Sequence, residues 1–350
     1  MLLVYSDWKA YRQGCMFLEG LGVPYRLTVN LNEYLETPAD FKLAISTSRF
    51  GQFLSLVYHQ DFVDKVTAVA EQSNLVVLIE SELHHECRVY PKCGPNVRWV
   101  IPGTINTNFA EQTFFSGAWL DRTRELYIQL PNKLAELKPH EVKPKYFDAL
   151  LGVTKSHRTT VYNYIHEYKL TDKIFATYSS LNCDFSYEPG TVNSNNNPDT
   201  TQNITYEGID TSISQVIPID IYNQTAYTIV TETDTDNDYS FFTEKIAKPL
   251  IARRLFVVFS GQHYLRNLRS LGFQTFDSVI DETYDTLEDP VHRYISAFQQ
   301  VKKLCEMDQA EVLAQIQPIV DHNHKLIMEQ DWSHPVRMYP ANLVKQLTGI

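Results

Sequence analysis

The triplet Thr243-Glu244-Lys245 combines a hydroxyl, a carboxylate and a fixed positive charge. A carboxylate can accept hydrogen bonds from both hydroxyls of a ribose, and a neighbouring lysine can neutralise a diphosphate. Arg158 lies at the predicted start of a helix, where a cation is unfavourable unless an anion lies between it and the helix. These residues therefore indicate binding of a nucleotide diphosphate. Taken separately, the triplet is equally compatible with a solvated helix start, and Arg158 with a surface arginine.

A second dense group of reactive side chains follows the apolar run Leu75–Ile79. Its members are Glu82, His84, His85, Glu86, Cys87 and Cys93. No standard zinc spacing fits them. His84, His85 or Glu86 is instead predicted as the catalytic base that accepts a proton from an acceptor substrate, with Glu111 and Asp121 as competing candidates.

An acidic repeat, Asp234-x-Asp236-x-Asp238, resembles the start of a calcium-binding loop. The sixth position of that loop is Tyr239 rather than glycine, and the twelfth is Lys245 rather than glutamate, so the pattern fails. A metal site of the D-x-D kind remains an alternative. The simpler interpretation is an acidic, solvated loop.

The elements that must position these groups follow two successive α/β patterns. In residues 1–130, apolar runs and helical spacing predict strands at Leu2–Ser6, Tyr25–Val29, Leu75–Ile79 and Val97–Ile101, and a helix at Asp61–Glu71. The segment 131–144 contains the prolines Pro131, Pro139 and Pro144 and is predicted as a linker. The first pattern is thus predicted to form an N-terminal, acceptor-side lobe.

The second pattern occupies residues 145–330 and is followed by a tail at 331–350. Its predicted strands are Tyr146–Leu151, Ile174–Tyr178, Ala226–Thr231 and Leu255–Phe259. Its predicted helices are Thr159–Tyr168, Phe241–Ala252, Gln262–Leu271, Pro290–Met307 and Gln309–Gln330. Such alternation predicts two Rossmann-like lobes facing a cleft, with ligands beyond the carboxyl ends of parallel strands. The polar stretch 191–203 is predicted as a surface excursion.

The order of these motifs resembles the donor domain of the α1,3-fucosyltransferase family over about residues 146–276. That family has an arginine before a tyrosine-containing helix, a strand ending F-E-N, then Y-x-T-E-K, and finally V-P-V-x-x-G-x-x-x-Y. The corresponding segments here are HRTTVY at 157–162, TET at 231–233, FTEK at 242–245 and the loop from Ser260 to Tyr264. Two departures are TET in place of F-E-N, and Ser260 in place of the usual glycine.

The resemblance implies a site for a nucleotide-sugar donor. Arg158 and Lys245 would hold the diphosphate and Glu244 the ribose, while Glu232 ends the preceding strand. Thr243 belongs to the matched motif, and Tyr264 matches the tyrosine after the last strand. The chain also looks like proteins of large marine tailed phages.

The predicted function is therefore that of a GT-B-like glycosyltransferase. It would move a sugar from a nucleotide-diphosphate donor to an acceptor, namely a modified DNA base, a glycan or a protein. Inverting transfer without an obligatory metal or other cofactor is implied. The alternative is an inactive, transferase-like virion or host-interaction protein, for which the polar stretch 191–203 would be a suitable surface.

Composition narrows the partners and the compartment. The net charge of −11 gives no global attraction to nucleic acid. A lysine-rich stretch around the linker could guide DNA, although interspersed acidic residues weaken it; its lysines are Lys133, Lys138, Lys143, Lys145 and Lys155. Five cysteines, an odd number, indicate reduced thiols and a cytoplasmic protein, in the host cytoplasm if phage-encoded. No apolar stretch reaches the roughly 18 residues of a membrane span.

Overall fold

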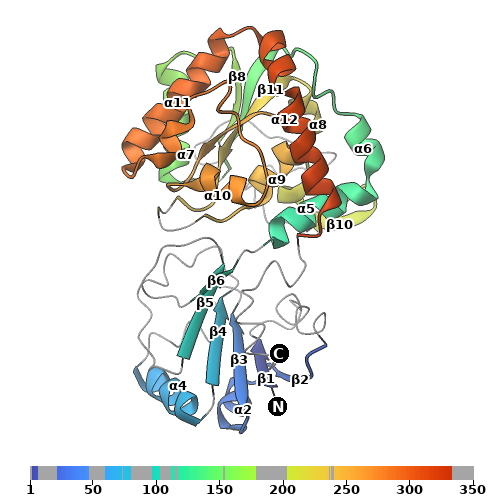
Figure 1. Cartoon of the computed structure of the whole chain (residues 1–350). Helices are drawn as coiled ribbons and strands as arrows, with labels where there is room; N and C mark the ends of the chain where they lie inside the picture. The colour runs from blue at the N-terminus through green and yellow to red at the C-terminus, as the bar shows by residue number, and fades with distance from the viewer. Residues whose placement is uncertain are drawn as a thin grey trace. The chain divides into compact units, whose positions relative to one another are not determined.

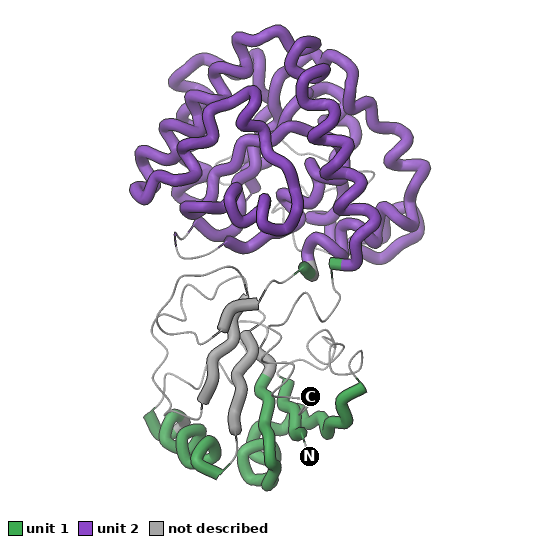
Figure 2. The backbone as a smooth tube through the Cα atoms, in the orientation of Figure 1, with its two compact units in different colours: residues 1–117, 332–350 green, residues 118–331 purple. Residues whose placement is uncertain are grey.

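The computed structural model describes residues 2–6, 22–46, 60–72, 74–79, 97–102, 112–114, 117–152, 154–178, 203–235, 237 and 240–332. The chain divides into two compact units (Figure 2). Unit 1 comprises Met1–Gly117 with Trp332–Ile350, and unit 2 comprises Ala118–Asp331.

Within its described residues, unit 1 is built on a six-stranded sheet of order β2-β1-β3-β4-β5-β6. Every pairing in this sheet is parallel, as the alternation of strands and helices predicted. The strands are β1 (Leu2–Ser6), β2 (Tyr25–Thr28), β3 (Phe41–Ser46), β4 (Asn74–Ile79), β5 (Val97–Pro102) and β6 (Gln112–Phe114). The described helices are α2 (Leu31–Glu36) and α4 (Gln60–Gln72). Strand β1 is buried along its whole length, as expected for a strand covered on both faces.

Strand β3 was not predicted, because Lys42 interrupts its apolar pattern. The Lys42 side chain is nevertheless buried. Its ammonium group donates to the carbonyls of Tyr34 and Leu35, at 2.8 and 3.1 Å, in the last turn of α2. The exposed carbonyls of a helix C-terminus can satisfy a cation in this way, so a lysine is tolerated inside the sheet.

Unit 2 contains a four-stranded sheet of order β12-β11-β7-β8, which is parallel throughout. Its strands are β7 (Lys145–Leu150), β8 (Ile174–Thr177), β11 (Thr225–Thr231) and β12 (Phe256–Phe259), close to the predicted bounds. From β7 the chain moves to β8 on one side and then returns to β11 on the other. The topological switch point therefore lies between β7 and β11, and the loops at the carboxyl ends of these two strands are where such sheets bind ligands.

Helices cover this sheet on both faces (Figure 1). Helix α7 packs with α11, and α11 packs on β12, whereas α9 packs on β11 and against α5 and α12. The helices of unit 2 are α5 (Ala118–Gln129), α6 (Pro131–Ala135), α7 (Ser156–Glu167), α8 (Ile219–Tyr222), α9 (Glu244–Ile251), α10 (Tyr264–Ser270), α11 (Pro290–Glu306) and α12 (Gln309–Glu329). None of the helices in the described ranges is long and apolar enough to cross a bilayer.

The connection from β8 to β11 includes a short antiparallel hairpin, β9 (Asn203–Tyr206) with β10 (Ile209–Ser212). Its two turn residues, Glu207 and Gly208, both have positive φ angles, of 51° and 83°. Tight hairpin turns need this conformation. The predicted surface excursion at 191–203 lies outside the described residues except for Asn203, the first residue of β9.

The boundary of unit 2 differs from the prediction. The division falls between Gly117 and Ala118, not in the proline-bearing segment 131–144. Helix α5 buries Leu120 and Tyr127, and the segment after it is fastened to Asn223 at the end of α8. Lys138 N donates to Asn223 Oδ1 at 3.0 Å, and Asn223 Nδ2 donates to Glu136 O at 2.9 Å. The prolines of 131–144 mark a surface segment of unit 2, including the first residue of α6, rather than a linker.

A buried charge cluster holds the amino half of β11 to its neighbours. We call Asp148, Thr225, Thr228 and Arg254 the amino-half cluster. Arg254 is 4% exposed and lies 2.8 Å from Asp148. Its guanidinium group also donates to the hydroxyls of Thr225 and Thr228, at 2.8 and 2.9 Å, and stacks 4.0 Å from the Tyr222 ring. Burial raises the pKa of the Asp148 carboxyl, and the charge of Arg254 opposes this increase.

Candidate functional site

The start of helix α9 is fixed by Thr243. This residue is the N-cap, with extended backbone angles, and its hydroxyl accepts a hydrogen bond from Lys245 N at 3.2 Å. Glu244 occupies the first turn, where a negative charge interacts favourably with the helix dipole. The helix begins at Glu244 rather than at the predicted Phe241, so the triplet forms its cap and first turn.

The Glu232 carboxylate, directly after β11, joins the connection from β11 to α9 with the start of α10. It is 0% exposed. One oxygen accepts from Tyr264 Oη at 2.7 Å and Thr243 N at 3.3 Å, and the other accepts from Thr243 Oγ1 at 2.6 Å and Thr233 N at 3.3 Å. Burial raises the pKa of Glu232, and the charge of Lys245 opposes the increase. Both oxygens are occupied, so Glu232 positions the starts of α9 and α10.

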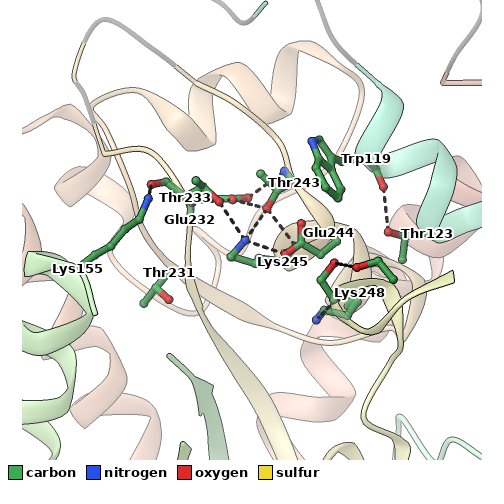
Figure 3. A network of polar contacts seen from close by, with 12 residues as sticks. Trp119, Thr123, Lys155, Thr231, Glu232, Thr233, Thr243, Glu244, Lys245 and Lys248 are labelled. Atoms are coloured by element: carbon green, nitrogen blue, oxygen red, sulfur yellow. Dashed lines mark hydrogen bonds and ion pairs between the residues drawn. The ribbon is translucent and has the colours of Figure 1, made fainter. Parts of the chain in front are cut away.

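Lys245 is the better exposed of the two charged residues that open α9, and Figure 3 shows its polar contacts. Its ammonium group donates to Glu244 Oε1 at 2.7 Å, Thr233 Oγ1 at 3.0 Å and Thr243 Oγ1 at 3.4 Å. The side chain of Lys245 is 23% exposed, against 8% for Glu244. Burial favours protonation of Glu244, but the charges of Lys245 and Lys248 outweigh it and lower the pKa of Glu244. An ionised carboxylate and a solvent-accessible ammonium group therefore lie side by side.

Helix α7 places basic side chains against the carboxyl end of β11. Three consecutive carbonyls, those of the last residue of β11 and the two residues after it (231–233), each accept from a different basic residue. The pairs are Lys155 Nζ to Thr233 O (2.5 Å), His157 Nε2 to Glu232 O (2.8 Å) and Arg158 Nη2 to Thr231 O (3.5 Å). The first turn of α7 contains no acidic residue. The loop after β7 and the loop after β11 are thus joined across the switch point.

The basic residues of α7 differ in how far they are buried. Arg158 is 5% exposed and His157 is 2% exposed, whereas Lys155 is half-buried. Burial, and then the charge of Arg158, lower the pKa of His157 to about 3, so its imidazole is neutral and donates to the Glu232 carbonyl. Arg158, predicted to hold a diphosphate, is directed towards the Thr231 carbonyl in this structure.

The structure brings together the residues that the sequence predicted for a donor site. We call Lys155, Arg158, Glu232, Thr233, Thr243, Glu244 and Lys245 the switch-point cluster, and Tyr264 joins it through Glu232. Sequence reasoning missed the parts of Lys155 and Thr233 in this cluster, and the hydrogen bond of His157 to the Glu232 carbonyl beside it. In the sequence, Lys155 stood out only as a member of the lysine-rich stretch. The other lysines of that stretch have partners outside the switch-point cluster. Lys133, for example, pairs with Glu136 and Glu207, each at 3.0 Å.

The predicted catalytic bases His84, His85 and Glu86 lie outside the described residues, as do Glu82, Cys87, Cys93 and Glu111. Asp121 is described, in α5 of unit 2, where its carboxylate lies 3.3 Å from Arg124 Nη1. Of the acidic repeat, only Asp234 is described, and its carbonyl accepts from Ser260 Oγ at 3.0 Å. Within the described ranges, no three His, Cys, Asp or Glu residues are grouped so that they could hold a metal ion.

The chemistry of the switch-point cluster suits a ligand with both phosphate and hydroxyl groups. Ammonium groups bind phosphate oxygens, and an ionised carboxylate accepts hydrogen bonds from a pair of hydroxyls. Both kinds of group are provided by residues whose backbones are fixed by a parallel sheet and by helix starts. The carboxyl ends of β7 and β11 are also the expected ligand position for this strand order.

Comparisons with known proteins give little beyond this geometry. No family model matches the sequence, and no curated protein matches it. Among solved structures the chain is similar to one described as "Crystal Structure of alpha1,3-Fucosyltransferase", with 12% identity and a TM-score of 0.34. That match covers 92% of this chain and 89% of the other. At such a TM-score, the similarity does not define the activity of this chain.

Proposed function

We propose that unit 2 binds the nucleoside diphosphate portion of a nucleotide sugar, and that the protein transfers the sugar to an acceptor. The observation that carries this proposal is the position of Lys245. Its side chain is 23% exposed, and its ammonium group is held by Thr233, Thr243 and Glu244 at the carboxyl end of the sheet. A preorganised cation at a topological switch point favours a phosphate-bearing ligand.

In the proposed reaction, the bond between the anomeric carbon and the diphosphate oxygen breaks as the bond to an acceptor oxygen forms. Negative charge develops on the leaving diphosphate, and the Lys245 ammonium group stabilises it by exchanging its longest hydrogen bond, 3.4 Å to Thr243 Oγ1, for a phosphate oxygen. The acceptor proton passes to a base, for which His84, His85 and Glu86 remain the sequence candidates. A single displacement inverts the anomeric centre. Lysine supplies the charge stabilisation that a metal ion supplies in other transferases.

Glu244 is proposed to accept the hydroxyls of the donor ribose. Its lowered pKa keeps the carboxylate ionised at neutral pH. Because Lys245 Nζ lies only 2.7 Å from Glu244 Oε1, a ribose on the carboxylate would bring its attached phosphates close to the ammonium group. One helix start would thus recognise adjoining parts of the same nucleotide.

The test is a panel of nucleoside diphosphates, with thermal stabilisation as the measurement. A ligand at about 100 times its Kd stabilises the folded chain by about 2.7 kcal/mol and raises Tm. Lys245→Ala is expected to weaken the binding of the nucleotide that stabilises the natural chain by about tenfold or more, since a hydrogen bond to a charged group contributes about 1.5–3 kcal/mol. Lys138→Ala is the matched control, because it removes a lysine that is 59% exposed and outside the cluster.

The results of the nucleotide panel can overturn the proposed function in two ways. A complete lack of response in the natural chain would overturn the proposal, as would an unchanged affinity in Lys245→Ala. Transfer to DNA with modified bases, to a glycan or to a protein would then identify the acceptor class. Loss of transfer on addition of EDTA would contradict the metal-independent mechanism and favour the acidic repeat at 234–238.

A further inference from the structure

Thr233 is contacted by two lysines that come from different helix starts. Lys155, the residue before α7, donates to the Thr233 carbonyl at 2.5 Å. Lys245, in the first turn of α9, donates to the Thr233 hydroxyl at 3.0 Å. Figure 3 shows the two side chains reaching this residue from opposite sides. The ammonium groups are therefore held a few ångströms to either side of one residue.

Three basic side chains lie close to this residue. Besides Lys155 and Lys245, the buried Arg158 lies beneath the neighbouring Thr231 carbonyl. The charges of Arg158, Lys155 and Lys245 each lower the pKa of the His157 imidazole, which donates to the Glu232 carbonyl next to Thr233. The acidic residues beside them are Glu244, which pairs with Lys245, the internally hydrogen-bonded Glu232, and Asp234, the residue after Thr233. Like charges gathered in this way are favourable when an anion lies between them.

Lys155 is better placed than Arg158 to meet such an anion. The Arg158 side chain is 5% exposed, whereas Lys155 is half-buried. An ammonium group has three N–H donors, so it can hold a carbonyl and a phosphate oxygen together. Thr233 fixes the ammonium group of Lys155 at the end of β11, beside the position that Lys245 occupies. This geometry supplies two separate cationic contacts at one site.

We infer that Lys155 is a second phosphate-binding residue and that Thr233 spaces it from Lys245, so that the site selects two linked phosphates over one. The inference rests on the proposed function and adds to it a specificity-determining residue. Each ammonium group would contact a different phosphoryl group of the ligand. A monophosphate could engage only one of them fully. Arg158 would then act as a positioning residue that fixes the carboxyl end of β11.

The experiment measures binding of inorganic pyrophosphate and inorganic phosphate by titration calorimetry on the full chain. The natural chain is expected to bind pyrophosphate more tightly. Lys155→Ala is expected to weaken the binding of pyrophosphate about tenfold, because one charge-assisted contact is lost. The affinity for phosphate should change much less. Lys155→Arg should restore most of the preference, and Lys138→Ala should leave both affinities unchanged.

A second variant covers the case in which Lys155→Ala does not fold. Thr233→Val keeps the carbonyl that Lys155 contacts and removes the hydroxyl that holds Lys245. It should reduce the preference for pyrophosphate while leaving the net charge unchanged. Thermal melting of each variant shows whether it is folded.

The results separate this inference from the function on which it rests. If Lys155→Ala retains pyrophosphate affinity within twofold while Lys245→Ala loses it, the second phosphate contact is refuted and the nucleotide site stands. An equal loss of pyrophosphate and phosphate affinity in Lys155→Ala would also overturn it, since that result indicates general positioning. If the natural chain binds neither pyrophosphate nor any nucleoside diphosphate, the proposed function itself fails.

Discussion

Strand β11 carries a polar cluster at each end, and the two clusters differ in what their charges face. In the amino-half cluster, Arg254 is 4% exposed and its nitrogens are hydrogen-bonded to hydroxyls, carbonyls and Asp148. In the switch-point cluster, Lys245 is 23% exposed and shares its neighbourhood with further basic side chains. A charge enclosed by its own partners serves the fold, whereas a fixed charge that solvent reaches can serve a ligand.

Removal of the buried cation in the amino-half cluster of β11 should cause a large loss of stability. Arg254→Ala should lower the free energy of unfolding by about 3–5 kcal/mol, because it leaves the Asp148 carboxylate buried without its cation. Urea denaturation measures this loss. The double variant Arg254→Ala/Asp148→Ala should recover part of it. A single-variant loss below about 1 kcal/mol would show that the ion pair does not hold the sheet together.

The second prediction concerns pH and the neutral histidine beneath the switch-point cluster. The pKa of His157 is about 3 in the folded chain, against an ordinary value of 6.5. Between these values the unfolded chain binds a proton that the folded chain does not. Stability should therefore fall as pH falls from 6.5 towards 3, by about 1.4 kcal/mol per pH unit for this group.

His157→Gln isolates that contribution, since its amide can still donate to the Glu232 carbonyl but does not titrate. Urea denaturation of both chains at a series of pH values gives the difference in slope. The variant should lose stability less steeply than the natural chain below pH 6.5. Parallel slopes would mean that His157 is protonated in the folded chain, contrary to its burial among Arg158, Lys155 and Lys245.

Much of the fold followed from the sequence because buried parallel strands leave a simple pattern. The runs at Thr225–Thr231 and Phe256–Phe259 are apolar or β-branched throughout, and both were predicted within a residue. Strand β3 was missed because Lys42 interrupts its apolar pattern. The hydrogen bonds from Lys42 to main-chain carbonyls of α2 make its burial possible, and a side-chain pattern does not predict such bonds. Helix α5 was likewise absent from the prediction, and with it the boundary of unit 2.

The candidate site was predictable in part for the same reason. Glu232 and the Thr243–Lys245 triplet stood out because they follow the end of a predicted strand. Lys155 did not, since its partner in the structure is the main-chain carbonyl of Thr233. The role predicted for Arg158 rested on its place at a helix start. Sequence position alone could not show that the side chain would be 5% exposed and directed towards the Thr231 carbonyl.

Lys245→Ala should reduce the stability of the chain least, and this variant tests directly whether the two clusters of β11 differ in role. Lys245 is partly exposed, and Lys248 still stabilises the buried Glu244 carboxylate after its removal, so the free energy of unfolding should fall by about 1–2 kcal/mol, less than for Arg254→Ala. Urea denaturation without ligand measures this quantity beside Arg254→Ala. A loss as large as that of Arg254→Ala would mean that Lys245 also serves the fold. Its weakened nucleotide binding would then no longer distinguish a ligand contact from a structural one.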